Sequence, residues 1–351
     1  MSNFTIRFSL QSSGSQAGFS LVELMISLTI GLLLLSGLTT LIVQQSNTRS
    51  ELDKSSRQIE NGRYAIQVLH DDIQLAGFYG QYTSIPAPTG AMPNPCATDL
   101  ASLNAAMSLP IQGYDALASI STPLSTCLNN ANFLSGTDIL VVRRVATATT
   151  TIANAAAADG GLVYLQATAA SQVLNTGSGA NTTNFPLTYN TSTNTGPADL
   201  RNYLVRIYFI SPCNTMANGT TCTASDDNGK PIPTLKCLEL SSTGGTSTFN
   251  LIPLVEGIQN LQLDYGIDSN SDGYPDSYVT TPATIADWGN VMAVRVNLLA
   301  RNNDTSMGYT DTKTYSMGKA GLVGAFNDAY KRHAYSEVIR AVNPSGRRAQ
   351  Q

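Results

Sequence analysis

The chain has 351 residues, of which 13% are charged, and a formal net charge of −4 at neutral pH. This length allows one large domain or two small ones with a sizeable core. Sparse charge combined with abundant Ser, Thr, Asn, Ala and Gly is typical of exported β-rich proteins with long polar loops. The slightly negative balance gives no reason to expect nucleic acid or an anionic membrane surface as a partner.

An apolar run from Phe19 to Val43 is long enough to cross the hydrocarbon core of a bilayer as a helix. Glu23 lies early in this run, and a carboxylate at that depth is costly unless it is paired, which makes it a candidate functional residue. An ordinary secretory signal would have a positive n-region, a shorter apolar stretch and a cleavage site after that stretch. Here a polar leader, Met1 to Gly18, instead ends in glycine immediately before the apolar run.

The junction GFSLVEL at 18–24 resembles the class III signal of type IV pilins and type II secretion pseudopilins. In those proteins a prepilin peptidase cuts after the glycine and methylates the new N-terminus. The resemblance implies that Gly18 is the last leader residue, Phe19 the N-methylated first residue of the mature protein, and Glu23 the assembly glutamate. The new amine lies about one helical turn from that carboxylate, so the two can pair within or between subunits. An ordinary signal anchor with a stray glutamate is the alternative.

After Val43 the pattern becomes amphipathic without proline, which predicts that the helix continues beyond the membrane. Leu52, Ile59, Ile66 and Ile73 recur every seven residues, so one stripe should face an apolar surface. A short coiled coil, interrupted by a glycine at position 62, is the alternative.

The segments IENGRYA at 59–65 and LAGF at 75–78 are similar to the stretch that follows the membrane helix in the PilW family of minor pilins. Gly77 lies where a helix C-cap is expected. Further along, runs of β-forming residues predict a mainly antiparallel sheet. These runs span 138–145, 162–167, 203–210, 235–240, 251–265 and 291–300. The small-residue tracts 146–160 and 177–198 are predicted to be exposed loops.

The expected fold class is therefore α+β, in the lollipop form of pilins: a long N-terminal transmembrane helix packed on a mainly antiparallel β-sheet head. We expect a class III leader at 1–18 that is removed, a transmembrane helix at 19–45, a periplasmic amphipathic helix at 46–80 and a β-rich globular head at 81–351.

The five cysteines form no CxxC pair and have no interleaved histidine, so disulfides are a better interpretation than a zinc site. Local pairing predicts Cys96 with Cys127 and Cys213 with Cys222, which leaves Cys237 as a spare thiol. Disulfides persist in oxidising compartments, so this interpretation and export support each other.

The segment DSNSDGYPD at 268–276 places oxygen ligands at alternating positions before a glycine, as in the first part of an EF-hand calcium loop. The candidate ligands are the side chains of Asp268, Asn270, Asp272 and Asp276 and the backbone carbonyl of Tyr274. Oxygen donors without His or Cys favour Ca²⁺, although valine replaces the glutamate expected at the twelfth position, which should weaken binding. A hairpin turn that needs no metal is the alternative.

The sequence offers little support for catalysis, and we expect no enzyme. His70 and His333 lie among polar or basic neighbours, where a solvated surface role is expected. Asp71 and Asp72 are adjacent on a predicted helix, which suits a polar face better than an acid/base pair. The nucleophile elbow, the P-loop and the HExxH motif are all absent from the sequence.

The resemblance implies a minor pilin that contributes to the assembly or priming of a type IV pilus, and so to twitching motility, adhesion or DNA uptake. Its implied partners are other minor and major pilins, through the N-terminal helix, and the prepilin peptidase. Its implied location is the inner membrane, with the N-terminus cytoplasmic and the head periplasmic, followed by the filament on the cell surface. The alternatives are a J-type minor pseudopilin of a type II secretion system and an exported, membrane-anchored hydrolase.

Overall fold

The computed structural model describes residues 18–190 and 195–350. By internal contacts the chain divides into two compact units, Met1–Asp53 and Lys54–Gln351, which we describe separately. Of the predicted leader, only Gly18 falls among the described residues.

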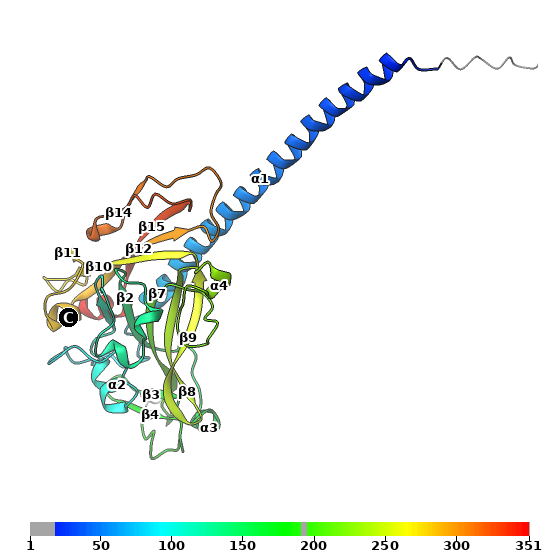
Figure 1. Ribbon diagram of the computed structural model, residues 1–351. Helices are drawn as coiled ribbons and strands as arrows, with labels where there is room; N and C mark the ends of the chain where they lie inside the picture. Colours follow the sequence, from blue (N-terminus) through cyan, green and yellow to red (C-terminus); the bar gives the residue numbers. More distant parts are fainter. Residues whose placement is uncertain (1–17, 191–194, 351) are drawn as a thin grey trace, which may run out of the picture. The chain divides into compact units, whose positions relative to one another are not determined.

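Helix α1 runs from Leu21 to Gln74 (Figure 1). In the first unit its large apolar side chains are exposed, and within the described part of the chain it is the one helix long and apolar enough to cross a membrane. The hydroxyl groups on this stretch bond back to the helix: Ser27 Oγ, for example, donates to the Glu23 carbonyl at 2.7 Å. Such bonds satisfy hydroxyls where water is absent.

From Lys54 onward the same helix forms part of the second unit. The predicted stripe is confirmed at Ile66 and Ile73, which are buried in the main core, but not at Leu52 or Ile59. The buried stripe begins with Gln58 and Gly62 and continues through Ala65 and Leu69. Ile59, by contrast, is 41% exposed, so the predicted seven-residue stripe is wrong at its start. The reason is steric, because the ring of a tyrosine on the sheet approaches the helix where glycine leaves room.

The larger sheet is antiparallel throughout and has the order β1-β2-β7-β3-β4, with β8 paired to β7 and β9 paired to β8. Its strands are β1 (Ile111–Tyr114), β2 (Ile139–Val145), β3 (Val163–Ala167), β4 (Gln172–Thr176), β7 (Leu200–Ser211), β8 (Thr234–Thr243) and β9 (Thr246–Glu256).

The second sheet, also antiparallel, has the order β11-β10-β12-β15. Its strands are β10 (Ile258–Ile267), β11 (Ser277–Val279), β12 (Val291–Arg301) and β15 (Arg332–Arg340). Two small hairpins pair β5 (Thr188–Asn190) with β6 (Thr195–Pro197) and β13 (Thr314–Ser316) with β14 (Leu322–Gly324).

Short helices fill the connections. They are α2 (Leu100–Ala106), α3 (Ile152–Ala157), α4 (Asp226–Gly229), α5 (Ile285–Gly289) and α6 (Val342–Arg348), with 3-10 turns η1 (Leu124–Thr126), η2 (Asn130–Asn132) and η3 (Gly318–Ala320).

Both faces of the larger sheet are covered. On one face, Val142 of β2 joins Leu69 of α1 and Leu263 of β10 in the main core. On the other face, Val141 of β2 joins a second core under segment 78–133, which includes Tyr79. Because successive strand residues point to opposite faces, a strand buried on both sides is apolar at nearly every position, as β2 is.

The prediction of an α+β fold with a long apolar helix and an antiparallel β-sheet head is confirmed. The predicted run 251–265 is not one strand, however. Gly257, at a φ of +77°, separates β9 in the larger sheet from β10 in the second sheet. The tracts 146–160 and 177–198 are not wholly exposed either, because Ala155 and Phe185 are buried against Tyr164.

Candidate functional site

The predicted processing site lies at the start of the described chain. Gly18, Phe19 and Ser20 precede the helix, and the Phe19 side chain is 82% exposed. The first helical bond joins the Leu24 N–H to the Ser20 carbonyl at 3.0 Å. This places a peptide bond accessible to a peptidase directly before the helix.

Glu23 occupies the first turn of α1, where the free N–H groups of the helix favour negative charge. No residue among those described bonds to its carboxylate, and the side chain is exposed. The carboxylate is thus available to an amine at the start of its own helix or of another. Whether Gly18, Phe19 and Glu23 have the implied roles stays a prediction.

A buried ionic cluster joins the second half of α1 to the larger sheet. Asp72 Oδ1 accepts hydrogen bonds from Arg144 Nε at 2.6 Å and from Arg206 Nη1 at 3.0 Å, and Asp72 Oδ2 accepts one from the Tyr208 hydroxyl at 2.7 Å. Burial, reinforced by the Asp72 carboxylate, raises the pKa of Tyr208 well above its usual value, so Tyr208 remains a donor. Glu239 completes the cluster by accepting from Arg206 Nε at 2.5 Å.

The expectation for Asp72 was therefore wrong. Asp71 is exposed, but Asp72 is 2% exposed and faces the sheet rather than the solvent. A paired buried charge of this kind fixes the position of the helix, because removing one partner leaves the others uncompensated. Its partners come from strands more than 70 residues away in sequence, so local sequence gave no signal for them.

His333 is exposed and His70 is partly exposed, as expected, and each contacts a residue of β15. His70 Nδ1 lies 2.8 Å from Glu337 Oε1, and the His333 ring meets the Tyr335 ring edge-on with centroids 4.7 Å apart. Both are structural contacts, and neither places a nucleophile beside a base.

In the loop predicted to bind calcium, the carboxylates are largely satisfied by the loop itself. The buried Asp268 accepts the N–H groups of Ser271 at 2.6 Å and Gly273 at 2.9 Å, and Arg348 Nε lies 3.7 Å from its Oδ2. Asp276 accepts from both the N–H and the hydroxyl of Ser269. The backbone thus wraps around Asp268 as in a tight polar turn.

One part of this loop still fits a cation. The Asn270 side-chain NH₂ group lies 3.1 Å from Asp272 Oδ2 and 3.4 Å from Asp276 Oδ1, so it occupies the point between the two carboxylates. Turning that amide over would bring three oxygens together, which is the donor set that Ca²⁺ takes. Calcium binding stays a prediction, with Arg348 beside Asp268 as the feature that disfavours it.

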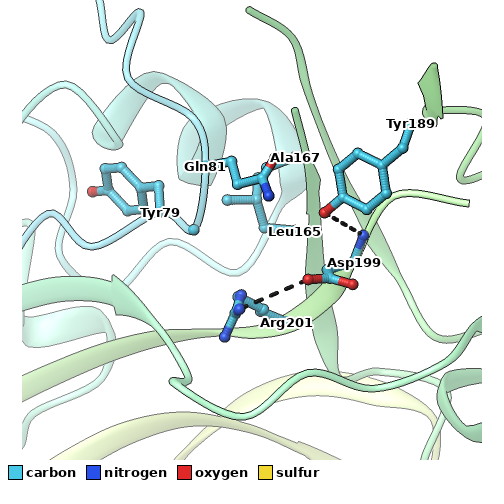
Figure 2. A pocket seen from close by; sticks show the side chains of 8 residues that line it. Tyr79, Gln81, Leu165, Ala167, Tyr189, Asp199 and Arg201 are labelled. Carbon is cyan, nitrogen blue, oxygen red and sulfur yellow. Dashed lines mark hydrogen bonds and ion pairs between the residues drawn. The ribbon is translucent and has the colours of Figure 1, made fainter. Parts of the chain in front are cut away.

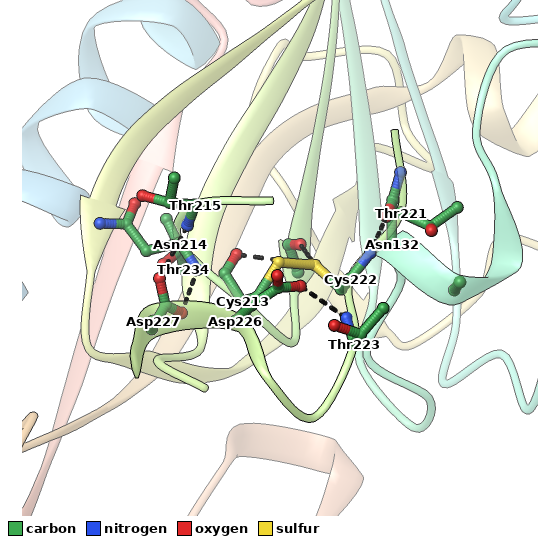
Figure 3. The surroundings of a disulfide bond; sticks show 12 residues. Asn132, Cys213, Asn214, Thr215, Thr221, Cys222, Thr223, Asp226, Asp227 and Thr234 are labelled. Atoms are coloured by element: carbon green, nitrogen blue, oxygen red, sulfur yellow. Dashed lines mark hydrogen bonds between the residues drawn. A yellow bond between two sulfur atoms is a disulfide. The ribbon is translucent and has the colours of Figure 1, made fainter. Parts of the chain in front are cut away.

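The disulfide Cys213–Cys222, which closes a loop after β7, confirms its predicted pairing (Figure 3). Two carboxylates order this loop from inside: Asp226 accepts the N–H groups of Ala217 and Thr223, and these bonds lower its pKa. Asp227 accepts three further N–H groups, from Asn214, Thr215 and Ile232. The two sulfur atoms lie close to the Asp226 carboxylate, but they bond to each other and so are not metal ligands.

A second disulfide joins Cys96 to Cys127 and ties the segment before α2 to η1. Cys237 is free, and it is buried in the main core. Burial raises the pKa of its thiol, which leaves it protonated and unreactive.

One enclosed cavity beside Tyr79 has a volume of about 10 Å³, which is room for a single water molecule. Figure 2 shows Arg201 and Asp199 at its wall, 3.9 Å apart, and Tyr189, whose hydroxyl accepts the Asp199 N–H at 3.2 Å. Asp199 thus interacts with both Arg201 and Tyr189, and the three residues form a structural contact at the cavity wall.

Comparison with known proteins gives two family matches. Residues 14–39 match the prokaryotic N-terminal methylation motif, and residues 216–343 match the type IV pilus-assembly protein W family. A type IV-like pilin from Thermus thermophilus is 11% identical over 82% of this chain and 97% of that one, but its TM-score of 0.32 is too low to establish a shared fold. No protein with a curated description matches the chain.

The methylation motif lies at the start of an exposed apolar helix, and this combination is similar to that of type IV pilin-like proteins. With the match over 216–343, the findings support a PilW-type minor pilin of type IV pili.

Proposed function

We propose that this protein is a minor pilin that is cut after Gly18, is methylated on Phe19, and contributes to the assembly or priming of a type IV pilus. The observation that carries the proposal is the coincidence of the methylation motif with an exposed apolar helix whose first turn holds Glu23, a carboxylate that pairs with no residue within 18–190 or 195–350. A pairing between this carboxylate and the Phe19 amine of a neighbouring subunit sets the axial register of packed helices.

The chain is divided accordingly. Residues 1–18 are the leader, 19–45 cross the inner membrane with the N-terminus cytoplasmic, and 81–351 form the head. Residues 46–80 lie in the periplasm, and α1 ends within them at Gln74. The partners are the prepilin peptidase before assembly and other minor and major pilins afterwards. The role is structural rather than catalytic, and it supports twitching motility, adhesion or DNA uptake.

A deletion strain tests this proposal against a pseudopilin of type II secretion. We expect the deletion to reduce surface pili and twitching, both restored by the wild-type gene, while the export of secreted enzymes continues. Intact piliation with failed protein secretion would favour the J-type pseudopilin instead.

We also propose that the 268–276 loop binds Ca²⁺ weakly. The support is the approach of Asp272 and Asp276 to the same side-chain amide, that of Asn270. Binding would orient that amide with its oxygen inward and stiffen the link between β10 and β11.

A further inference from the structure

Strand β9 forms one edge of the larger sheet (Figure 1). It pairs with β8 on one side, and no main-chain group of the described residues bonds to its other side. The second half of the strand is protected by Pro253, by a bulge at Leu254 and by Glu256, whose carbonyl accepts from the Asn61 side chain. The first seven residues, TSTFNLI at 246–252, contain no charge, no proline and no bulge. Charged residues, prolines and bulges usually protect natural edge strands from pairing with other chains. Strand β15, at an edge of the other sheet, has four such acidic or basic side chains.

A groove of about 560 Å³ runs beside this edge. It is lined on one side by the consecutive residues Ser247, Thr248 and Phe249, and on the other by the segment that the Cys96–Cys127 disulfide holds in place. Because successive side chains of a strand point to opposite faces, a groove that touches Ser247, Thr248 and Phe249 reaches the main chain of this strand as well as its side chains. An open row of main-chain groups therefore lies beside a space for side chains, as strand addition requires.

The groove is lined by one negative charge, which favours a ligand with a basic side chain. Asp99 is the one charged residue in its lining, and it is exposed. Its carboxylate accepts the Ser102 N–H at 2.8 Å, and this bond is the main cause of its lowered pKa, so it is ionised at neutral pH. A second copy of β9 is a poor occupant, since 246–256 contains no basic residue to meet this carboxylate.

We propose that the edge of β9 binds an extended segment of another polypeptide, different in sequence from this chain, which adds as a strand and places a lysine or arginine beside Asp99. Main-chain bonds to 246–252 supply affinity, and the carboxylate selects a basic side chain at one position. In a filament, a neighbouring subunit would supply the segment, and that clause alone rests on the proposed function.

The test is amide hydrogen exchange on the full-length protein in detergent micelles. The probes are two acetylated heptapeptide amides, Thr-Val-Thr-Lys-Thr-Val-Thr and the same peptide with Glu in place of Lys. We expect the lysine peptide to slow exchange in 246–252, and to bind about two- to fivefold more tightly than the glutamate peptide, as suits one exposed ion pair. Asp99→Asn keeps the helix cap but should remove this preference. Asp304→Asn, at an exposed carboxylate outside the groove, should retain it.

Each alternative result overturns a stated part of the proposal. No protection of 246–252 by either peptide at millimolar concentration would remove the strand-addition site. Equal protection by both peptides, or a lysine preference that survives Asp99→Asn, would remove the role of Asp99. Protection that grows with protein concentration in the absence of peptide would assign the edge to a second copy of this chain.

Discussion

At the scale of single residues, the Glu23 carboxylate has no partner among the described residues and lies at the N-terminus of a helix that has to be buried in lipid or in other helices. An unpaired charge in that environment is costly, so pairing with an amine lowers the free energy of the assembled helices. We expect Glu23→Ala to leave cleavage intact and to lower the amount of protein in sheared filaments severalfold. Glu60→Ala, at an exposed glutamate further along α1, is the control and should assemble normally. Normal assembly of the Glu23 variant would contradict the pairing.

A second residue, Asp138, gives a prediction about pH. It is buried, and its carboxylate accepts the N–H groups of Ala116 and Leu263, each at 2.7 Å. Burial outweighs these bonds and raises its pKa from 3.8 to about 7. Since the folded protein holds this proton more tightly than the unfolded chain, the contribution to stability is complete below pH 4 and is lost as pH rises through 7.

We therefore expect Asp138→Asn, which mimics the protonated group, to flatten this slope. Between pH 4.5 and 8 the wild type should lose on the order of a few kcal/mol of unfolding free energy relative to the variant. Urea titrations at several pH values measure the difference. Parallel pH profiles for the two proteins would show that Asp138 is ionised in the fold.

At the scale of elements, the contact between α1 and β15 depends on Gly62. A Cβ atom placed there would overlap the Tyr335 ring, closer than real side-chain contacts come. We expect Gly62→Ala to cost about 1–3 kcal/mol of unfolding free energy, as overpacking does. Tyr335→Leu should relieve the clash, so the double variant should be more stable than the sum of the single changes allows. If the two changes in unfolding free energy simply add, the Tyr335 ring does not pack against Gly62.

The same elements show what the sequence could and could not predict. The apolar run and the runs of β-forming residues are local patterns, and they predicted α1 and the antiparallel sheet. The glycine junction predicts a processing site, which stays a prediction. The stripe on α1 was predicted correctly at Ile66 and Ile73 but not at its start, where the tyrosine that packs on the helix comes from β15. Asp72 was misread because its two arginines lie on β2 and β7. In each miss the deciding partner is distant in sequence.

At the scale of the whole molecule, calcium should act on the stability of the head if the 268–276 loop binds it. We expect the full-length protein in detergent to melt at a higher temperature in millimolar Ca²⁺ than in chelator, by an amount set by mass action. Asp272→Asn keeps a side-chain oxygen for the Tyr274 N–H but removes a charge, so it should abolish the difference. Asp268→Ala is less informative, because that carboxylate also holds the loop's own N–H groups. If the melting temperatures in chelator and in Ca²⁺ up to several millimolar are equal, the 268–276 loop is a turn that binds no calcium.

The central claim is that this chain becomes a filament subunit by losing its leader at one defined bond. Mass spectrometry of the protein in sheared surface filaments and in membranes tests it most directly. We expect a mature chain that begins with N-methylated Phe19 and retains the whole of α1. An N-terminus at Met1 in the filament fraction, or one created by cleavage after the apolar run, would contradict the assignment of the chain as a pilin.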